Sequence, residues 1–220
     1  RQDPDGVAGL VLDSSLTSAP RGLAPLIERA DAAIGRLAAA CAASPPCAAN
    51  GDVRANLDAA QARLDADPFI AADGTAVTGA TVRLGVVTAL TRTDLLPLVP
   101  VVLAQLAAGD SPVLEALLAE LTPAPQTDVD SLASGTYGVV TCADDGPETP
   151  ADLARRADPG PWSDEVLAEA AFCDVWNVHE ERDARLGPAS TDHPVLAFTG
   201  EFDPWAPIEF TEEILAAHPN

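Results

Sequence analysis

The sequence predicts an α/β protein in which a long helical region separates two strand-forming segments. Val7 to Leu12 is a short apolar run near the amino end, and Val195 to Thr199 is a second one near the carboxyl end. Short apolar runs with β-branched and aromatic residues are typical of buried parallel strands. Between the two runs, apolar residues recur at three- and four-residue spacing, which is typical of amphipathic helices.

The helical region divides into several predicted helices with recognisable ends. The face of the first contains Ile27, Ile34 and Cys41. Asp52 is a suitable N-cap for the second helix, and Gly109 is a suitable end for a later one that carries two prolines in its first turn. Helices are predicted over residues 27–41, 53–67, 82–90, 95–108, 113–121, 164–176 and 209–217.

Composition favours a folded core of small side chains and excludes some partners. Apolar residues make up 47% of the 220 residues but aromatic ones only 4%, so Ala, Val and Leu must supply most of the core. Acidic residues outnumber basic ones 34 to 12, which gives a net charge of −22. A chain this acidic repels phosphate groups, so nucleic acid is not expected as a partner. The charge could steer a cationic substrate or serve only to keep the surface solvated.

The most apolar predicted helix, Leu95 to Ala108, is too short to span a bilayer. A transmembrane helix needs about 20 residues, and this one also contains two prolines and Gln105. No membrane span is therefore predicted. The segment fits the core of a helical region, and the alternative is a lipase-like lid that opens on an apolar interface.

The four cysteines fall into two groups that predict two disulfides. Cys41 and Cys47 flank a turn-forming stretch. Cys142 follows a strand-like segment, Tyr137 to Thr141, and Cys173 lies near the end of a predicted helix. Bridges Cys41–Cys47 and Cys142–Cys173 are expected, and four reduced buried thiols are the alternative. The spacings match no zinc site and no redox motif, so no metal is expected. Disulfides indicate export.

Asp203 follows the second strand-forming run in a turn that restricts its backbone. Gly200 breaks the run, and Pro204 biases Asp203 toward extended geometry. A carboxylate held in this way suits catalysis. The alternative is a turn Asp that only accepts hydrogen bonds from nearby backbone amides.

The segment Pro194-Val-Leu-Ala-Phe-Thr-Gly-Glu-Phe-Asp-Pro-Trp-Ala-Pro207 resembles the acid-bearing turn of α/β-hydrolases, in particular secreted tripeptidyl-aminopeptidase-like and prolyl-aminopeptidase-like serine peptidases. Val7-Ala-Gly-Leu-Val-Leu-Asp-Ser-Ser15 is similar to that family's strand after the nucleophile helix. Cys142-Ala-Asp-Asp145 and Cys173-Asp-Val-Trp176 are similar to its paired cysteine motifs, and the family implies the same Cys142–Cys173 pairing. Together the anchors span nearly the whole chain.

The resemblance implies a partial α/β-hydrolase sheet with a large inserted helical lid. Residues 1–19 would be a core strand and loop, residues 20–130 the lid, and residues 131–220 the lid return and a truncated carboxyl-terminal part of the core. Asp203 would be the acid of a Ser-Asp-His triad, and Asp13, after the first strand, is a rival.

The other two triad members are not expected in this chain. It contains no Gly-x-Ser-x-Gly elbow, and none of His179, His193 and His218 lies where the family places its base. We therefore expect an internal fragment that is inactive alone and needs no cofactor.

The resemblance implies an exported enzyme, extracellular or in the cell envelope, that releases residues or short peptides from free N-termini. Asp144, Asp145 and Glu201 are candidates for binding the substrate ammonium, because an unpaired ammonium is costly to bury; the alternative for the Asp pair is a solvated acidic loop. An esterase or lipase acting on small esters is an alternative on the same fold, and a non-catalytic binding protein derived from the lid is another.

Overall fold

The structure is a computed structural model that describes residues 6–17, 23–71, 74, 76–109, 135–136, 139–140, 142–143, 171–175 and 191–218. Within these residues, helices are combined with two small sheets, in agreement with a mixed α and β composition. The chain divides into two units. Unit 1 comprises Arg1–Arg29 and Gly135–Asn220, and unit 2 comprises Ala30–Ser134. The lid expected over residues 20–130 coincides with unit 2 over residues 30–130, and its identity as a lid stays a prediction.

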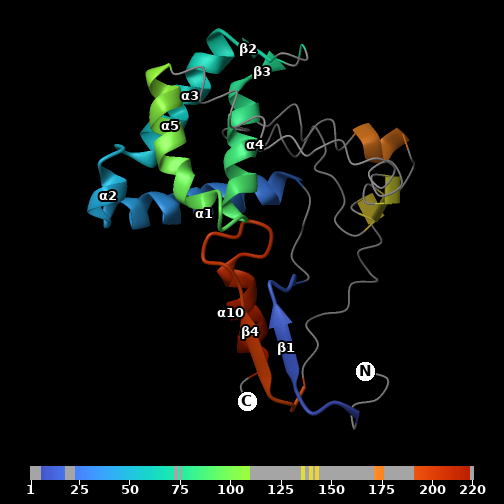
Figure 1. The fold of residues 1–220 in the computed structure, drawn as a ribbon. Coiled ribbons are helices and arrows are strands. Elements are labelled where there is room, and N and C mark those ends of the chain that lie inside the picture. Colours follow the sequence, from blue (N-terminus) through green and yellow to red (C-terminus); the bar gives the residue numbers. More distant parts are fainter. Residues whose placement is uncertain are drawn as a thin grey trace. The chain divides into compact units, whose positions relative to one another are not determined.

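Unit 1 contains a two-stranded parallel sheet built from the two predicted strand-forming runs. β1 (Leu10–Asp13) pairs with β4 (Val195–Phe198), and the register places Leu10 opposite Val195 and Asp13 opposite Phe198. Figure 1 shows the two strands side by side. α10 (Ile208–Ala216) follows β4 and contacts it. The parallel pairing of strands from opposite ends of the chain confirms this part of the sequence prediction.

In the part of the chain that the structure describes, the two faces of this parallel sheet differ in burial. The side chains of Leu10, Leu12, Val195 and Ala197 are half-buried. On the other face, Val11, Leu196 and Phe198 are 69%, 60% and 47% exposed. The sequence predicted a strand buried on both faces, and in the part of the chain that the structure describes this is wrong. Alternate side chains of a strand point to opposite faces of the sheet, and those of the second face stay accessible to solvent here.

Unit 2 is mainly helical, and the boundary between the units falls within α1 (Leu23–Ala42). α3 (Val53–Ala66) packs against both α4 (Gly79–Leu90) and α5 (Val99–Ala108). Smaller elements complete the described part of the unit: α2 (Pro45–Ala48), η2 (Leu96–Leu98), and an antiparallel pair of two-residue strands, β2 (Phe69–Ile70) and β3 (Ala76–Val77). No helix in the described part of the chain is both long and apolar enough to cross a bilayer.

Aliphatic side chains form the core of unit 2, as the composition predicted. Ile34 of α1, Leu57 of α3 and Leu103 of α5 are each at most 2% exposed. Burying a side chain of this size contributes about 1.5–3 kcal/mol. The three-four spacing of apolar residues therefore turns the apolar face of each of these helices toward the core, and this explains how α3 packs against α4 and α5.

Several helix ends lie where the residues predicted them. The side chain of Asp52 accepts a hydrogen bond from the Ala55 amide (2.8 Å) at the start of α3. Gly109 has a φ of 94° and closes α5 in the left-handed conformation that glycine adopts without steric cost. α4 begins at Gly79 rather than at residue 82. A capping box marks this start, in which the Thr78 amide donates to the Thr81 hydroxyl (3.2 Å), and the Gly79 amide donates to the Asp65 carboxylate of α3 (2.8 Å).

Both expected disulfides are present. Cys41–Cys47 has an Sγ–Sγ distance of 2.04 Å and Cys142–Cys173 one of 2.00 Å. The strand expected over Tyr137 to Thr141 is wrong in its described part, because residues 139–140 are helical, as are residues 142–143. The β-propensity of Val139 and Val140 is a weak preference that tertiary context overrides.

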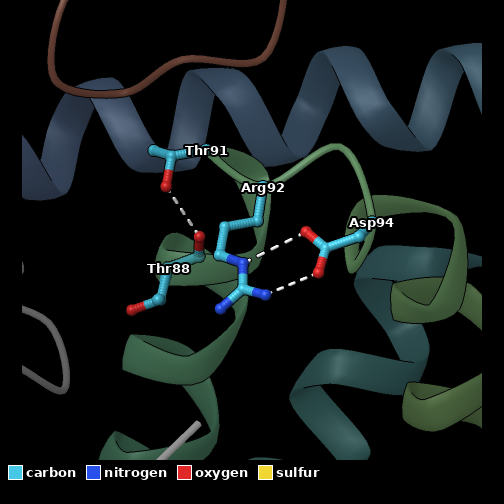
Figure 2. Close-up of polar contacts among 4 residues, drawn as sticks. All are labelled: Thr88, Thr91, Arg92 and Asp94. Carbon is cyan, nitrogen blue, oxygen red and sulfur yellow. Dashed lines mark hydrogen bonds and ion pairs between the residues drawn. The ribbon is translucent and has the colours of Figure 1, made fainter. Parts of the chain in front are cut away.

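The connection between α4 and η2 is held by polar contacts that Figure 2 shows. Arg92 donates from Nε and Nη2 to the two carboxylate oxygens of Asp94 (3.1 and 2.5 Å), and the Thr91 hydroxyl donates to the Thr88 carbonyl (2.8 Å). The hydrogen bond from Arg92 lowers the pKa of Asp94 below its ordinary value of 3.8. This ion pair is exposed, so water screens most of its effect on stability.

Candidate active site at the carboxyl end of the parallel sheet

The carboxyl ends of β1 and β4 lie at the same edge of the sheet. Asp13 is opposite Phe198, and the pairing continues one residue further, where the Ser14 amide donates to the Phe198 carbonyl (2.9 Å). The turn between β4 and α10 therefore starts from the edge at which β1 also ends. In open α/β sheets, ligands bind beyond the carboxyl ends of the strands. Asp203 lies in this turn, at the edge of the sheet where such a site would form.

The backbone of the turn orients the Asp203 carboxylate. Oδ1 of Asp203 accepts hydrogen bonds from the amides of Trp205 (2.8 Å) and Ala206 (3.2 Å), and the Asp203 amide donates to the Gly200 carbonyl (3.2 Å). The side chain is half-buried. Within the described residues, Oδ2 accepts no hydrogen bond. One carboxylate oxygen is thus fixed by main-chain donors, and the other is left for a further donor.

This geometry bears on both interpretations of Asp203. The two amide hydrogen bonds are those that a structural turn Asp makes. They are also what a triad acid needs, because a carboxylate that orients an imidazole must itself be held in place. Since both bonds use Oδ1, the structural role does not consume the oxygen that the catalytic role would require.

Contacts outside the Asp203 carboxylate fix the rest of the turn. The Thr199 hydroxyl donates to the Ala206 carbonyl (2.6 Å), which ties the start of the turn to its end. Pro204 is less than 2% exposed. Arg29 of α1 donates from Nε to the Pro204 carbonyl (3.1 Å), and its guanidinium carbon lies 5.4 Å from the centroid of the Phe210 ring.

The sequence pattern did not identify Arg29 as part of the candidate site. The contact joins residues that are 175 positions apart. A lone arginine beside an apolar helix face carries no signal for a partner at that distance, so only the fold could reveal it.

The rival acid Asp13 and the candidate Glu201 are both exposed. Asp13 accepts a hydrogen bond on Oδ1 from the hydroxyl of Ser14 (3.2 Å). Ser14 itself has a φ of 48°, which is uncommon for a residue other than glycine. Glu201 lies two residues before Asp203 in the same turn. Asp144 and Asp145 lie outside the described residues.

The histidines in the described residues have other partners than Asp203. A ring nitrogen of His218, Nδ1, lies 2.7 Å from the Ile214 carbonyl at the end of α10. The His193 amide donates to the Thr191 hydroxyl (3.2 Å). Neither histidine donates to the Asp203 carboxylate, and His179 lies outside the described residues. No group of three or more His, Cys, Asp or Glu side chains in the described ranges could hold a metal ion.

No protein-family model matches this chain, and no curated protein matches it. The functional assignment therefore depends on the sequence motifs and on the geometry of the turn that carries Asp203.

Proposed function

We propose that this chain is the lid and the carboxyl-terminal core portion of an exported serine hydrolase in which Asp203 is the triad acid. The observation that carries the proposal is the state of this carboxylate. It is half-buried beyond the carboxyl end of a parallel strand, two amides hold its Oδ1, and its Oδ2 accepts no hydrogen bond from the described residues. An imidazole Nδ1–H that reached Oδ2 would be fixed in the tautomer that a general base needs.

In this reaction, a histidine takes the proton of the attacking serine, and the acid stabilises the imidazolium that forms. Asp203 would perform only that last task. The 220 residues contain no Gly-x-Ser-x-Gly elbow, so the nucleophile and the base would come from polypeptide outside them. The chain alone would then hydrolyse nothing. Unit 2, which is inserted in the sequence between β1 and β4, would be the lid.

The open face of the parallel sheet supports a larger core. Parallel sheets are normally covered by helices on both faces. Here Val11, Leu196 and Phe198 are exposed on one face of the described pair. We propose that further polypeptide of the same hydrolase covers these side chains. The two disulfides, Cys41–Cys47 and Cys142–Cys173, fit an oxidising, extracellular or cell-envelope location.

An aminopeptidase acting on free N-termini is the preferred activity. The substrate would carry a positive ammonium, and the net charge of −22 favours the approach of cations. Glu201 lies in the same turn as the proposed acid and is exposed. Among the residues that the structure describes, it is therefore the candidate for contact with the substrate ammonium. Asp144 and Asp145 remain candidates outside the described residues. An esterase or lipase is favoured instead by Leu98 and Val101, which leave 52% and 39% of their surfaces exposed on η2 and α5.

The test is an assay of the complete gene product with chromogenic aminoacyl, tripeptidyl and short acyl-ester substrates. Asp203→Asn removes the charge and the hydrogen-bond pattern that the imidazole needs, and we expect kcat to fall by a factor on the order of 10⁴. Asp13→Asn is the matched control, because Asp13 is a carboxylate at the same edge of the sheet. It should change kcat by less than about threefold.

Three results would contradict the proposal. An Asp203→Asn variant with full activity would remove the acid role, and a large loss in Asp13→Asn would transfer that role to Asp13. A complete reading frame without a Gly-x-Ser-x-Gly elbow would leave the hydrolase without its nucleophile. Hydrolysis of acyl esters but of no aminoacyl or tripeptidyl substrate would replace the aminopeptidase with the esterase.

A further inference from the structure

Arg29 contacts the peptide group that holds the Asp203 carboxylate. The Pro204 carbonyl, which accepts the hydrogen bond from Arg29 Nε (3.1 Å), belongs to the same planar peptide as the Trp205 amide. That amide donates to Asp203 Oδ1 at 2.8 Å. One peptide unit is therefore bonded at its oxygen to a cation from α1 and at its nitrogen to the proposed catalytic carboxylate.

The planarity of the peptide makes these two hydrogen bonds dependent on each other. Because C=O and N–H of a trans peptide are fixed in one plane, a rotation that turns the Pro204 oxygen away from Arg29 also turns the Trp205 hydrogen away from Asp203. Hydrogen bonds in a chain also polarise one another, so a cationic donor on the oxygen strengthens the bond that the nitrogen makes.

The guanidinium of Arg29 is itself held in place. Its central carbon lies 5.4 Å from the centroid of the Phe210 ring, which is within the range of a cation–π contact. Phe210 is only 7% exposed and belongs to the first turn of α10. A buried aromatic ring thus fixes the donor, the donor fixes the Pro204–Trp205 peptide, and that peptide fixes Oδ1 of Asp203.

We propose that Arg29 is a positioning residue that sets the orientation of the Asp203 carboxylate through the Pro204–Trp205 peptide. The catalytic consequence rests on the proposed function of Asp203. The structural part, the dependence of the Trp205 amide on Arg29, stands independently of it. The two parts are therefore tested separately, one in the 220-residue chain and one in the complete gene product.

The first experiment measures amide hydrogen exchange by NMR in the 220-residue chain. Arg29→Met removes the donor and the charge but keeps an apolar stem. We expect the Trp205 amide to exchange about tenfold faster, which corresponds to the loss of one hydrogen bond to a charged group. Arg29→Lys keeps a charged donor and should accelerate this amide less than threefold. Arg92→Met, which removes a cation from the exposed pair with Asp94, is the control and should leave the Trp205 amide unchanged.

Two exchange results would overturn the inference. One is an unchanged Trp205 amide in Arg29→Met, and the other is an acceleration shared equally by the amides of β4 and α10, which would indicate general destabilisation. If Arg29→Met does not fold, Phe210→Leu supplies the test. It removes the ring beneath the guanidinium and should accelerate the Trp205 amide about threefold, and no change in that variant would also overturn the inference.

The second experiment measures kinetics in the complete gene product. Arg29→Met should lower kcat about tenfold and leave KM within twofold, and Arg29→Lys should restore most of kcat. An unchanged kcat beside a strongly impaired Asp203→Asn variant would refute the positioning role alone. A fully active Asp203→Asn variant would refute the proposed function, while a faster Trp205 exchange in Arg29→Met would still establish the link between Arg29 and the turn.

Discussion

The hydrogen bond between Thr199 and Ala206 gives a quantitative test of how the acid-bearing turn is held. Thr199→Val replaces the hydroxyl by a methyl group of similar size. The bond is short, at 2.6 Å, and its acceptor is the carbonyl of Ala206, a residue only 3% exposed. Leaving a buried acceptor without its donor costs about 1–3 kcal/mol. We expect Thr199→Val to lower the free energy of unfolding of unit 1 by about 1–2 kcal/mol.

The assay is urea unfolding followed by tryptophan fluorescence. All three tryptophans, Trp162, Trp176 and Trp205, belong to unit 1, so the signal reports on the unit that contains the turn. With a urea dependence of about 2 kcal/mol per M, the midpoint should fall by about 0.5–1 M. Thr199→Ser keeps the hydroxyl and is the matched control, with an expected loss of less than about 1 kcal/mol. Equal midpoints for Thr199→Val and the parent chain would refute the reasoning.

Two further predictions concern unit 2. Because the hydrogen bond from Arg92 lowers the pKa of Asp94, the Asp94 carboxyl should titrate below 3.8 by NMR, and its pKa should return toward 3.8 in Arg92→Gln. The contribution of this pair to stability is present above pH 3.8 and is lost as the pH falls through the lower pKa of the folded state. An Asp94 carboxyl that titrates at or above 3.8 in the parent chain would contradict the contact. Leu57→Ala should lower the free energy of unfolding by about 2–5 kcal/mol in circular dichroism at increasing urea, because Leu57 is 2% exposed in the core of unit 2. The matched change Leu84→Ala removes a side chain that is 52% exposed and should cost less than about 1 kcal/mol. Equal losses of unfolding free energy in the two variants would contradict the burial of Leu57 in the core of unit 2.

Local signals predicted the parts of the fold that depend on neighbouring residues. Asp52 caps α3 because its side chain reaches the Ala55 amide three residues on, and Gly109 ends α5 because it adopts a positive φ. Cys41 and Cys47 could be paired because only a short turn separates them. In each case, the residue and its partner lie within about one or two helical turns, so the sequence pattern contains the whole interaction.

The parts that sequence reasoning missed depend on distant partners or on very short elements. β2 and β3 are two residues each, too short for any alternation to show, and no strand was predicted between the helices at residues 53–67 and 82–90. At the start of α4, the Gly79 amide donates to Asp65 on another helix, which no local pattern indicates, whereas the Thr78–Thr81 capping box at the same end is a local signal that the helix prediction missed.

The candidate site shows the same limit. The turn residues Gly200, Asp203 and Pro204 predicted a rigid carboxylate, because their backbone preferences act locally. The identity of the donors to Oδ1 and the contact from Arg29 could not be predicted, since they depend on how β4, α10 and α1 come together. The strand pattern predicted that Asp203 lies beyond the end of β4. It did not predict that Val11, Leu196 and Phe198 are exposed on one face of the sheet.

The most direct test of the central claim is a crystal structure of the complete gene product. We predict that an imidazole Nδ1 lies within about 3 Å of Oδ2 of Asp203, while Oδ1 keeps its hydrogen bonds to the Trp205 and Ala206 amides. A structure in which the catalytic imidazole is bonded to another carboxylate, such as Asp13, or in which Oδ2 of Asp203 faces only solvent, would contradict the claim that this carboxylate is the triad acid.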